Sequence, residues 1–380
     1  MKHKYRIFKQ LQIFLFLSLN ISGLAQSVNI SLYNDNNLQS VLISPVSSPF
    51  GVTFDNSINM VVKPGDTIYL SVNGDFLEVK MLNGSHRTCR EFRMTGIDND
   101  ATYKVNPVIP VLEEREYDGD FVASFDINRI LLVNHIQIDR YLAGVVLTEG
   151  GPGRLPEYYK TQAILCRTYL LKHINKHSGE GFNLCDDVHC QAYKTRGSQN
   201  KRIIKAINET SGLVIVDRNS ELITTAYHSN CGGQTSNSDD VWLKYYPYLK
   251  SISDPNCSRG NNGKWRETIS VEQWLNYIRE NGYKGNIANP VSFKFSQPVR
   301  KTHYWIDDFS LPLKKIRNDW DLKSSFFNID LEDNQLVFNG KGYGHGVGLC
   351  QEGAMEMAYQ GKNYRQIIGF YYQDVKIKKF

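Results

Sequence analysis

Apolar and polar residues alternate along the first part of the chain, from about Val28 to Val111. Segments such as TIYLSV and FLEVKML show this period of two, and turn signals such as PGD and NG separate them. Because neighbouring side chains of a strand point to opposite faces, the pattern predicts short strands. We therefore predict a small β-rich accessory domain over residues 26–115, and we find no catalytic motif in it.

A spacing of three to four residues between apolar positions takes over in the rest of the chain. It predicts a helix over IDRYLAGVVLTE, with Asp139 as a candidate N-cap and GGPG as its end, and a second helix from about Leu155 to Ile174. Further helices are predicted over residues 271–281 and in CQEGAMEMAYQ and NYRQIIGFYY, and a hairpin in LVIVD and ELITTAYHS. The predicted fold class is α+β, with a mixed, catalytic-type domain over residues 116–380 after the boundary stretch VNPVIPVLEEREYDGD.

The stretch GKGYGHGVGLCQEGA, residues 340–354, has glycine at every second position from Gly340 to Gly348. We predict an extended segment that has one face of bare backbone and Tyr343 and His345 on the other. Bare backbone allows close approach either of a ligand or of a neighbouring chain segment, and both alternatives remain open. Neither G-x-G-x-x-G nor Gly-Lys-Ser/Thr occurs here, which excludes the usual phosphate-binding loops.

The N-terminal residues have the composition of a targeting segment. A basic start, an apolar middle and small residues ending at Ala25 predict a secretory signal peptide, residues 1–25, with an uncleaved anchor as the alternative. We therefore expect an exported protein of the periplasm or cell envelope, without a convincing membrane span after cleavage. The chain carries +5, and residues 1–25 hold four basic and no acidic residues, so 40 basic and 39 acidic residues remain. This balance gives no electrostatic reason to expect nucleic acid as a partner.

Glu149 is the first candidate for acid–base chemistry. It closes the helix predicted over IDRYLAGVVLTE, where the helix dipole disfavours a negative charge. The apolar run before it suggests partial burial, which also raises the pKa of a carboxyl group. A carboxyl that stays protonated near neutral pH can serve as a general acid. The alternative is an ordinary solvated glutamate at a helix end.

Two cysteines and two histidines lie close together in HSGEGFNLCDDVHC. His177, Cys185, His189 and Cys190 offer a tetrahedral ligand set for a structural Zn²⁺, and His173 is a spare candidate. A disulfide between Cys185 and Cys190, with the histidines at the surface, is the alternative.

Another cysteine pair follows in AYHSNCGGQTS and DPNC. Cys231 could act as a nucleophile with His228 as its base. In an exported protein, a disulfide from Cys231 to Cys257 is the better prediction, and closing that loop is worth roughly 3 kcal/mol in the chain-entropy model. The count of seven cysteines is odd, so at least one has no disulfide partner.

Several stretches resemble one family, the stage II sporulation protein D and amidase enhancer (SpoIID/LytB) domain family. They occur in the family's order from about residue 120 to the C-terminus, and the N-terminal domain is not covered. The glycine-histidine block and the HSNCGG block are the most specific of them. The stretches are YLAGVVLTE, KTQAILCRTYLL, CQAY, AYHSNCGGQTSNSDDVW, PYLKSISDPNC, LKSSFFNI and GKGYGHGVGLCQEGAMEMAYQGKNYRQIIGFYY.

The resemblance implies an exported peptidoglycan lytic transglycosylase. Such an enzyme cleaves between N-acetylmuramic acid and N-acetylglucosamine and leaves 1,6-anhydromuramyl ends, with Glu149 as the one acid and base. The resemblance also supports a zinc on the His2Cys2 set, glycan strands without stem peptides as substrate, and a cell-wall amidase as partner. The sequence GGPGRLP replaces the family's usual Met-Pro-like pair and tryptophan after the glutamate. The residues then expected to line the groove are Arg167, Gln191, Tyr193, His228, Ser229, Ser325, His345 and Gln351.

Three functions are compatible with these motifs. The first is the transglycosylase, and the second is a non-catalytic peptidoglycan-binding modulator that stimulates a cell-wall amidase. The third is an exported enzyme whose zinc does the chemistry. A catalytic zinc usually keeps one coordination position open, and a complete His2Cys2 set closes it, so the third function is disfavoured.

Overall fold

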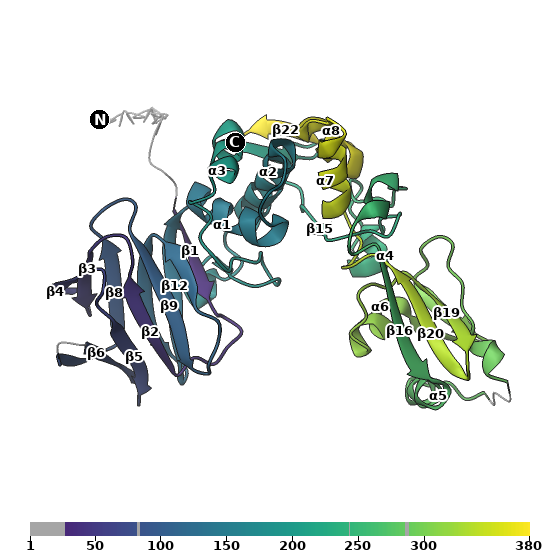
Figure 1. Cartoon of the computed structure of the whole chain (residues 1–380), viewed down its shortest axis with the longest axis horizontal. Coiled ribbons are helices and arrows are strands. Elements are labelled where there is room, and N and C mark those ends of the chain that lie inside the picture. Colours follow the sequence, from purple (N-terminus) through teal and green to yellow (C-terminus); the bar gives the residue numbers. More distant parts are fainter. Residues whose placement is uncertain (1–26, 82–83, 243, 286–288) are drawn as a thin grey trace, which may run out of the picture.

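The computed structural model describes residues 27–81, 84–242, 244–285 and 289–380. The predicted signal peptide, residues 1–25, lies outside the described residues. The fold is α+β, as predicted, with a β-rich N-terminal unit. In Figure 1 this unit lies on the left, a group of helices lies in the centre, and a small lobe built on β16, β19 and β20 extends to the right.

The β-rich unit consists of two sheets in which all neighbours are antiparallel except β1 and β13, which are parallel. In spatial order, the seven-stranded sheet contains β13 (Leu184–Cys185), β1 (Ser27–Leu32), β12 (Arg129–Gln137), β11 (Asp120–Asp126), β8 (Glu91–Gly96), β3 (Phe50–Phe54) and β4 (Ser57–Val62). The six-stranded sheet contains β10 (Arg115–Asp118), β9 (Thr102–Ile109), β2 (Ser40–Pro45), β5 (Ile68–Asn73), β6 (Phe76–Met81) and β7 (His86–Cys89).

The predicted strand pattern is confirmed in this unit, but the strands continue past the predicted boundary at residue 115. TIYLSV and FLEVKML form β5 and β6, which pair with each other, and β5 alternates buried and half-buried positions over most of its length. Residues 115–137 add three more strands, which complete the sheets. Leu184–Cys185 also joins the seven-stranded sheet, through its parallel pairing with β1. The β-rich unit and the central helices share one hydrophobic core.

The central helices include the helix that ends with the candidate acid Glu149 and the helix that begins with Gln351. The five longest elements of this region are α1 (Ile138–Gly150), α2 (Pro156–Lys172), α3 (Lys201–Glu209), α7 (Gln351–Tyr359) and α8 (Tyr364–Tyr371). The N-cap of α1 is Gln137, without a side-chain cap, so the expectation that Asp139 caps this helix is corrected. Asp139 instead accepts a hydrogen bond from Arg167 of α2, which ties the two helices together.

Short strands join distant parts of the chain around these helices. The predicted hairpin of LVIVD and ELITTAYHS forms only near its turn, where Asp217 N–H donates to the Glu221 carbonyl and Ile223 N–H to the Ile215 carbonyl around a bridge from Val216 to Leu222. The first arm also forms β14 (Leu213–Val216), which pairs with β22 (Lys376–Lys379) near the C-terminus. β15 (Tyr227–His228) instead runs parallel to β21 (Leu349–Cys350).

The small lobe has a hydrophobic core of its own, centred on Trp274. Its three-stranded sheet has the order β16-β20-β19, and the predicted helix over residues 271–281 is confirmed as α5. The elements of this lobe are β16 (Lys264–Ser270), α5 (Val271–Glu280), η3 (Pro290–Phe293), β17 (His303–Ile306), β18 (Phe309–Pro312), α6 (Leu313–Asp319), β19 (Phe327–Glu332) and β20 (Gln335–Lys341). Three short elements lie outside it: η1 (Ser178–Glu180), α4 (Ser238–Trp242) and η2 (Pro255–Arg259).

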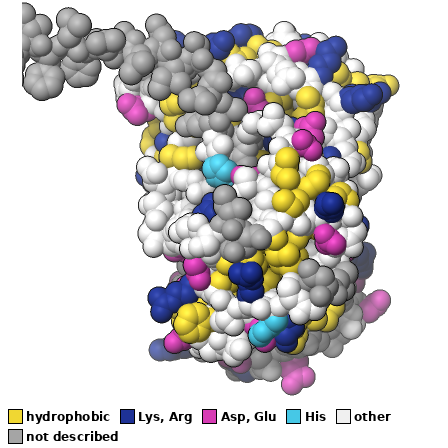
Figure 2. Space-filling model, turned by 90° about the vertical axis from the view of Figure 1, so that its left-hand side faces the viewer, with side chains coloured by type: hydrophobic (Ala, Val, Ile, Leu, Met, Phe, Trp, Pro, Cys, Tyr) yellow, Lys and Arg dark blue, Asp and Glu magenta, His cyan; other side chains and the backbone are white. Residues whose placement is uncertain are grey.

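None of the helices in the described residues has the length and apolar character needed to cross a membrane. At the end of the β-rich unit that faces the viewer in Figure 2, basic and acidic side chains are interspersed rather than separated by sign. This surface gives no electrostatic attraction for a polyanion.

Candidate active site

A cavity of about 880 Å³ lies between the central helices and the segments that connect them to the small lobe. Glu149 and Gln351 reach it from α1 and α7, and His345 reaches it from the glycine run. Aromatic rings form much of its wall, as is common in sites that stack on sugar rings. The lining residues are Glu149, Tyr169, His173, Val188, His189, Cys190, Thr224, Thr225, Ala226, Tyr227, His228, Ser229, Trp242, Lys244, Tyr246, Arg317, Tyr343, Gly344, His345 and Gln351.

Glu149 is held in place by contacts from three separate segments. The backbone N–H of Ala192 donates to its Oε1 at 3.0 Å, and the Tyr227 hydroxyl donates a second hydrogen bond to its carboxylate. Gln351 Nε2 donates to the backbone carbonyl of Glu149 at 3.2 Å. The side chain therefore has a fixed orientation at the cavity wall.

Burial is the largest influence on the pKa of Glu149 and raises it above the ordinary value for glutamate. The hydrogen bonds from Ala192 and Tyr227 favour the charged form and lower the pKa, but the net shift is upward. Its position at the C-terminal end of α1 adds to the upward shift, because the helix dipole disfavours a negative charge there. The environment therefore favours a protonated carboxyl, as the sequence predicts.

Two of the histidines that line the cavity, His228 and His345, are uncharged near neutral pH. Burial lowers the pKa of His345 to about 4 and that of His228 well below its ordinary range. The ring nitrogen Nδ1 of His345 accepts a hydrogen bond from the N–H of Val347, so its proton lies on Nε2. His228 has the opposite arrangement, because its Nδ1 donates to the Val347 carbonyl and therefore carries the proton. Its Nε2 is buried without a protein partner among the described residues.

The glycine run does not form the predicted strand. Gly342, Gly344, Gly346 and Gly348 all have positive φ, between 72° and 107°, a conformation that other residues rarely adopt. The run packs against the segment 226–236: a Cβ on Gly348 would lie 2.2 Å from the carbonyl oxygen of Ala226. Packing against a neighbour therefore explains the bare backbone, and the same conformation turns His345 toward the cavity.

The proposed metal ligands come together beside the cavity. The ligand atoms of His177, Cys185, His189 and Cys190 all lie within 4.8 Å of one another. His177 Nε2 is 3.5 Å from Cys190 Sγ, and His189 Nδ1 is 3.7 Å from Cys185 Sγ. Ligands of a tetrahedral zinc bound at its usual distances are about 3.5–3.8 Å apart, so these residues fit the ion. The spare candidate His173 lies outside the cluster and lines the cavity instead.

The geometry around the four ligands also suits a metal. His177 Nδ1 lies 2.6 Å from Glu180 Oε1, the carboxylate contact that orients many metal-bound histidines. Both cysteines are free thiols in this structure, and the alternative disulfide between them stays a prediction. The cluster fixes the start of the segment 190–192, whose Ala192 N–H donates to Glu149.

The sulfurs of Cys231 and Cys257 are 3.3 Å apart, and both cysteines are free thiols in this structure. The predicted disulfide between them therefore stays a prediction. Cys231 is fully buried, and its Sγ also contacts the Asp254 carboxylate at 3.3 Å. His228 Nδ1 is engaged by the Val347 carbonyl, which leaves no role for this histidine as a base through that nitrogen.

The cavity brings together five of the residues predicted for catalysis or substrate binding, and the structure places the other four elsewhere. The five are Glu149, His228, Ser229, His345 and Gln351. Gln191 is buried behind the wall, where it accepts a hydrogen bond from Tyr141, and Ser325 lines an adjoining hollow of about 210 Å³ together with Arg300 and Arg317.

Arg167 and Tyr193 are corrections to the predicted groove. Arg167 is buried and donates to the carbonyl of Thr210, so it connects α2 to the end of α3. Tyr193 is fully buried and packs against α1, where a Cβ on Gly144 would lie 2.3 Å from its ring. Both side chains carry polar groups, but they lie in the interior and hold neighbouring segments together.

Sequence reasoning missed several lining residues, among them Tyr227, Trp242, Lys244 and Arg317. Tyr227 precedes the recognised HSNCGG block directly, so its place in that block was the available signal. Arg317 comes from α6 of the small lobe, which ends shortly before the recognised stretch LKSSFFNI and lies outside it. Its Nε donates to the Leu322 carbonyl, and no carboxylate lies within 4.0 Å of its guanidinium in the part of the chain that the structure describes.

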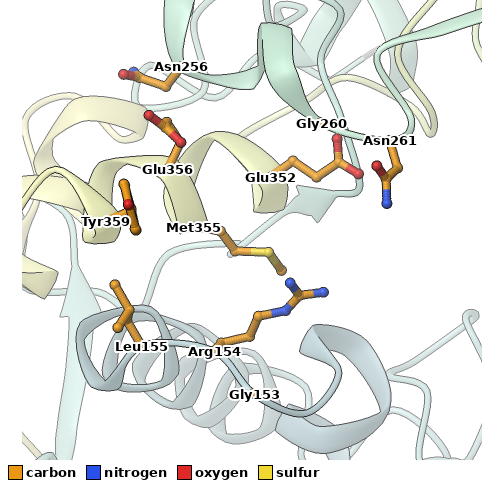
Figure 3. A pocket seen from close by; sticks show the side chains of 10 residues that line it. All are labelled: Gly153, Arg154, Leu155, Asn256, Gly260, Asn261, Glu352, Met355, Glu356 and Tyr359. Atoms are coloured by element: carbon orange, nitrogen blue, oxygen red, sulfur yellow. The ribbon is translucent and has the colours of Figure 1, made fainter.

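A second hollow, of about 360 Å³, is lined by Glu352, Met355, Glu356 and Tyr359 of α7. Figure 3 shows that Arg154 and Leu155, from the loop after α1, face Met355 and Tyr359 of α7 across it. Glu352 accepts hydrogen bonds from Asn230 and Asn262 and so belongs to the framework of the site. This hollow includes the GGPGRLP loop in which the chain departs from the family pattern.

Comparisons with known proteins agree with the geometry. Residues 126–216 match the family model described as stage II sporulation protein. An alignment to the stage II sporulation protein D of Bacillus amyloliquefaciens is 27% identical over 310 residues and covers 77% of this chain and 85% of that protein. An uncharacterised protein of Brachyspira hyodysenteriae is 28% identical over 276 residues, or 69% of this chain and 72% of that protein.

The amidase enhancer of Bacillus subtilis is also similar to this chain. It is 26% identical over 298 residues, which cover 63% of this chain and 40% of the enhancer. The family match spans α1 with Glu149, the His2Cys2 cluster and the segment that contacts Glu149. The chain is therefore similar to proteins of the stage II sporulation protein D and amidase enhancer family, most specifically over residues 126–216.

Proposed function

We propose that this protein is an exported peptidoglycan lytic transglycosylase with Glu149 as its catalytic residue. The observation that carries the proposal is the cavity wall, in which Glu149 is the sole carboxylate among the described lining residues. The names of two relatives, a sporulation protein and an amidase enhancer, support a role at the cell wall. The test is mass spectrometry of digested glycan strands for 1,6-anhydromuramyl ends.

A single carboxyl group is sufficient for this reaction. Hydrolytic glycosidases generally use two carboxylates, one as acid and one as nucleophile or base. In a lytic transglycosylase the C6 hydroxyl of the muramyl residue attacks its own C1, so no water needs activation, and the proximity of the two groups lowers the barrier.

Glu149 acts twice in this scheme. The protonated carboxyl first donates its proton to the glycosidic oxygen, and the bond from that oxygen to the muramyl C1 breaks. The resulting carboxylate then takes the proton from the C6 hydroxyl as the new C6–O–C1 bond forms. The proton that Glu149 gives to the leaving oxygen is replaced by the proton of the C6 hydroxyl, so Glu149 is protonated again at the end of the reaction. The Ala192 N–H and the Tyr227 hydroxyl stabilise the carboxylate between the two steps.

We assign a structural role to a zinc on His177, Cys185, His189 and Cys190. The four side chains would complete the coordination of the ion, which leaves no open position for substrate. When bound, the metal would hold the segment that ends at Ala192. That segment supplies one of the two hydrogen bonds to the Glu149 carboxylate.

Arg317 supports glycan without stem peptides as the substrate. Its guanidinium lines the cavity and has no carboxylate within salt-bridge distance among the described residues. Burial lowers its pKa, an effect that Tyr343 and Asp321 partly offset, and the group stays protonated at neutral pH. Removal of a stem peptide leaves a free lactyl carboxylate on the muramyl residue. A charge-assisted hydrogen bond from Arg317 would recognise that group.

Replacing Arg317 by glutamine is expected to weaken binding of peptide-free glycan roughly 10- to 100-fold, the loss typical for a hydrogen bond to a charged group. Strands that keep their stem peptides lack the carboxylate and should bind equally to both proteins. Binding is measured in the Glu149→Gln background, so that no strand is cleaved. The exposed Arg279→Gln variant of α5 is the control. An equal loss for both kinds of strand would contradict the assignment.

Activity is expected to fall as pH rises through the raised pKa of Glu149, because the acid form is then lost.

The same raised pKa of Glu149 also makes the stability of the folded protein depend on pH. The folded protein holds this proton more tightly than the unfolded chain, so the stabilisation is present at low pH and is lost as pH passes the folded pKa. The Glu149→Gln variant should therefore gain stability relative to the native protein as pH rises, as measured by urea unfolding at several pH values. A difference that is constant across pH would contradict the raised pKa.

A second candidate is a non-catalytic peptidoglycan-binding protein that stimulates an amidase, which the name of the Bacillus subtilis relative favours. The same cavity would then hold a glycan strand without cleaving it. Glycan that co-sediments with the native protein and keeps its chain length would favour this function over the enzyme.

A further inference from the structure

A second cluster of metal-binding side chains lies behind the glycine run, away from the His2Cys2 set. Its members are Cys231, Asp254, Cys257 and Cys350, and one ligand atom of each lies within 4.8 Å of all the others. All four residues are buried. They come from three separate parts of the chain: the loop after β15, the start of η2, and the junction of β21 with α7.

A disulfide explains only part of this cluster. The 3.3 Å between Cys231 Sγ and Cys257 Sγ compares with about 2.05 Å in a disulfide and about 3.8 Å between two thiolates on one tetrahedral zinc. A bond between these two sulfurs would leave Cys350 and Asp254, the N-caps of α7 and η2, converging on it from two further sides. Four converging ligands match a metal site better than a pair.

Backbone N–H groups point at the sulfurs, as they do around metal thiolates. The N–H of Cys231 donates to Cys350 Sγ at 3.3 Å, and the N–H of Gly353 donates to the same sulfur at 3.4 Å. The N–H of Gly233 donates to Cys257 Sγ at 3.2 Å. Cys350 is also the N-cap of α7, where the helix dipole favours a thiolate.

Asp254 completes the set with an oxygen ligand. It is fully buried, and it has no salt-bridge partner in the described parts of the chain. The Tyr371 hydroxyl donates to its Oδ2 at 2.8 Å, a contact that would orient the carboxylate toward a metal. Arg300 lies next to the cluster, where its Nη2 donates to the Cys231 carbonyl at 2.8 Å, and its positive charge offsets part of the negative charge of the ligands.

We propose that Cys231, Cys257, Cys350 and Asp254 form a second metal site, which binds Zn²⁺ in a structural role. Three soft sulfur ligands and one carboxylate suit zinc in a closed tetrahedral site, and the thiols release their protons to solvent as the metal binds. The ion fastens the loop after β15 to the first turn of α7. Those two segments carry His228 and Gln351 to the catalytic cavity.

The metal content of the purified full chain tests the proposal. We expect two zinc ions per chain in the native protein and one in the Cys350→Ser variant. The matched control is Cys89→Ser, which changes a buried cysteine of β7 outside both clusters and should keep two ions. His177→Ala should remove the other ion only, so the double variant with Cys350→Ser should hold none. Zinc content unchanged by Cys350→Ser would overturn the site.

Two further measurements do not depend on how well the Cys350→Ser variant folds. In the His177→Ala protein, Co²⁺ should give the visible bands of tetrahedral cobalt and an intense thiolate-to-cobalt absorption in the near ultraviolet. Absence of that thiolate absorption would overturn the proposal. Peptide mapping of the native protein without reductant should find Cys231 and Cys257 as thiols, and a linked Cys231–Cys257 peptide would instead establish the disulfide.

Discussion

Replacing Glu149 by glutamine is expected to eliminate nearly all release of 1,6-anhydromuramyl products from glycan strands. Loss of a general acid and base typically costs roughly 10²- to 10⁴-fold in rate, and the described cavity wall offers no other carboxylate to take over. Glutamine keeps the shape of the side chain but cannot donate a proton to the leaving oxygen. Mass spectrometry of the digested strands measures the products directly.

The control is Glu272→Gln, which removes an exposed carboxylate from the first turn of α5, outside the cavity. This variant should retain full activity. Glycan binding by Glu149→Gln should remain close to that of the native protein, because the substitution removes a proton donor rather than the cavity. If Glu149→Gln still formed anhydro ends at the native rate, the assignment of the catalytic residue would be wrong.

Substituting Gly348 with alanine is expected to destabilise the protein by roughly 2–5 kcal/mol, the sum of a left-handed backbone and an overpacked contact. Its φ is 72°, and the added Cβ would lie 2.2 Å from the Ala226 carbonyl oxygen, so the backbone of one segment must move. The shift would reach Gln351, three residues later, and through it the carbonyl of Glu149. Urea unfolding and glycan cleavage measure the two effects.

Gly361→Ala separates the two causes. Gly361 also has positive φ, at 83°, but an added Cβ there would meet nothing within 4 Å. Its cost should be limited to backbone strain, about 1–2 kcal/mol, with no effect on activity. Equal destabilisation by the two substitutions would show that close packing of the glycine run contributes little.

Local patterns predicted most of the helices and many of the strands, because each depends on residues close in sequence. The helix that carries Glu149 and the helix over residues 271–281 are examples, and so are the short strands β5 and β6. The cluster of candidate metal ligands at residues 177–190 could be proposed for the same reason, since its members are neighbours in the chain.

The predictions that the structure corrects failed for a different reason, because the residues concerned depend on contacts with segments distant in the sequence. Alternating glycines predict a strand by their spacing, but their conformation is set by the segment 226–236 packed against them. Polar side chains within a recognised motif suggested a groove for Arg167 and Tyr193, yet both fill the interior. Arg317 was missed because the small lobe brings it to the cavity, and no local pattern reports that approach.

The hydrogen bond from Gln351 to the Glu149 carbonyl joins residues 202 positions apart. Because that wall of the cavity comes from the last part of the chain, it cannot form until nearly the whole polypeptide has emerged and the connecting loop has closed. A chain that ends before α7 therefore has Glu149 but lacks this wall of the cavity. Under the proposed function, cleavage would require the C-terminal part of the chain to be in place.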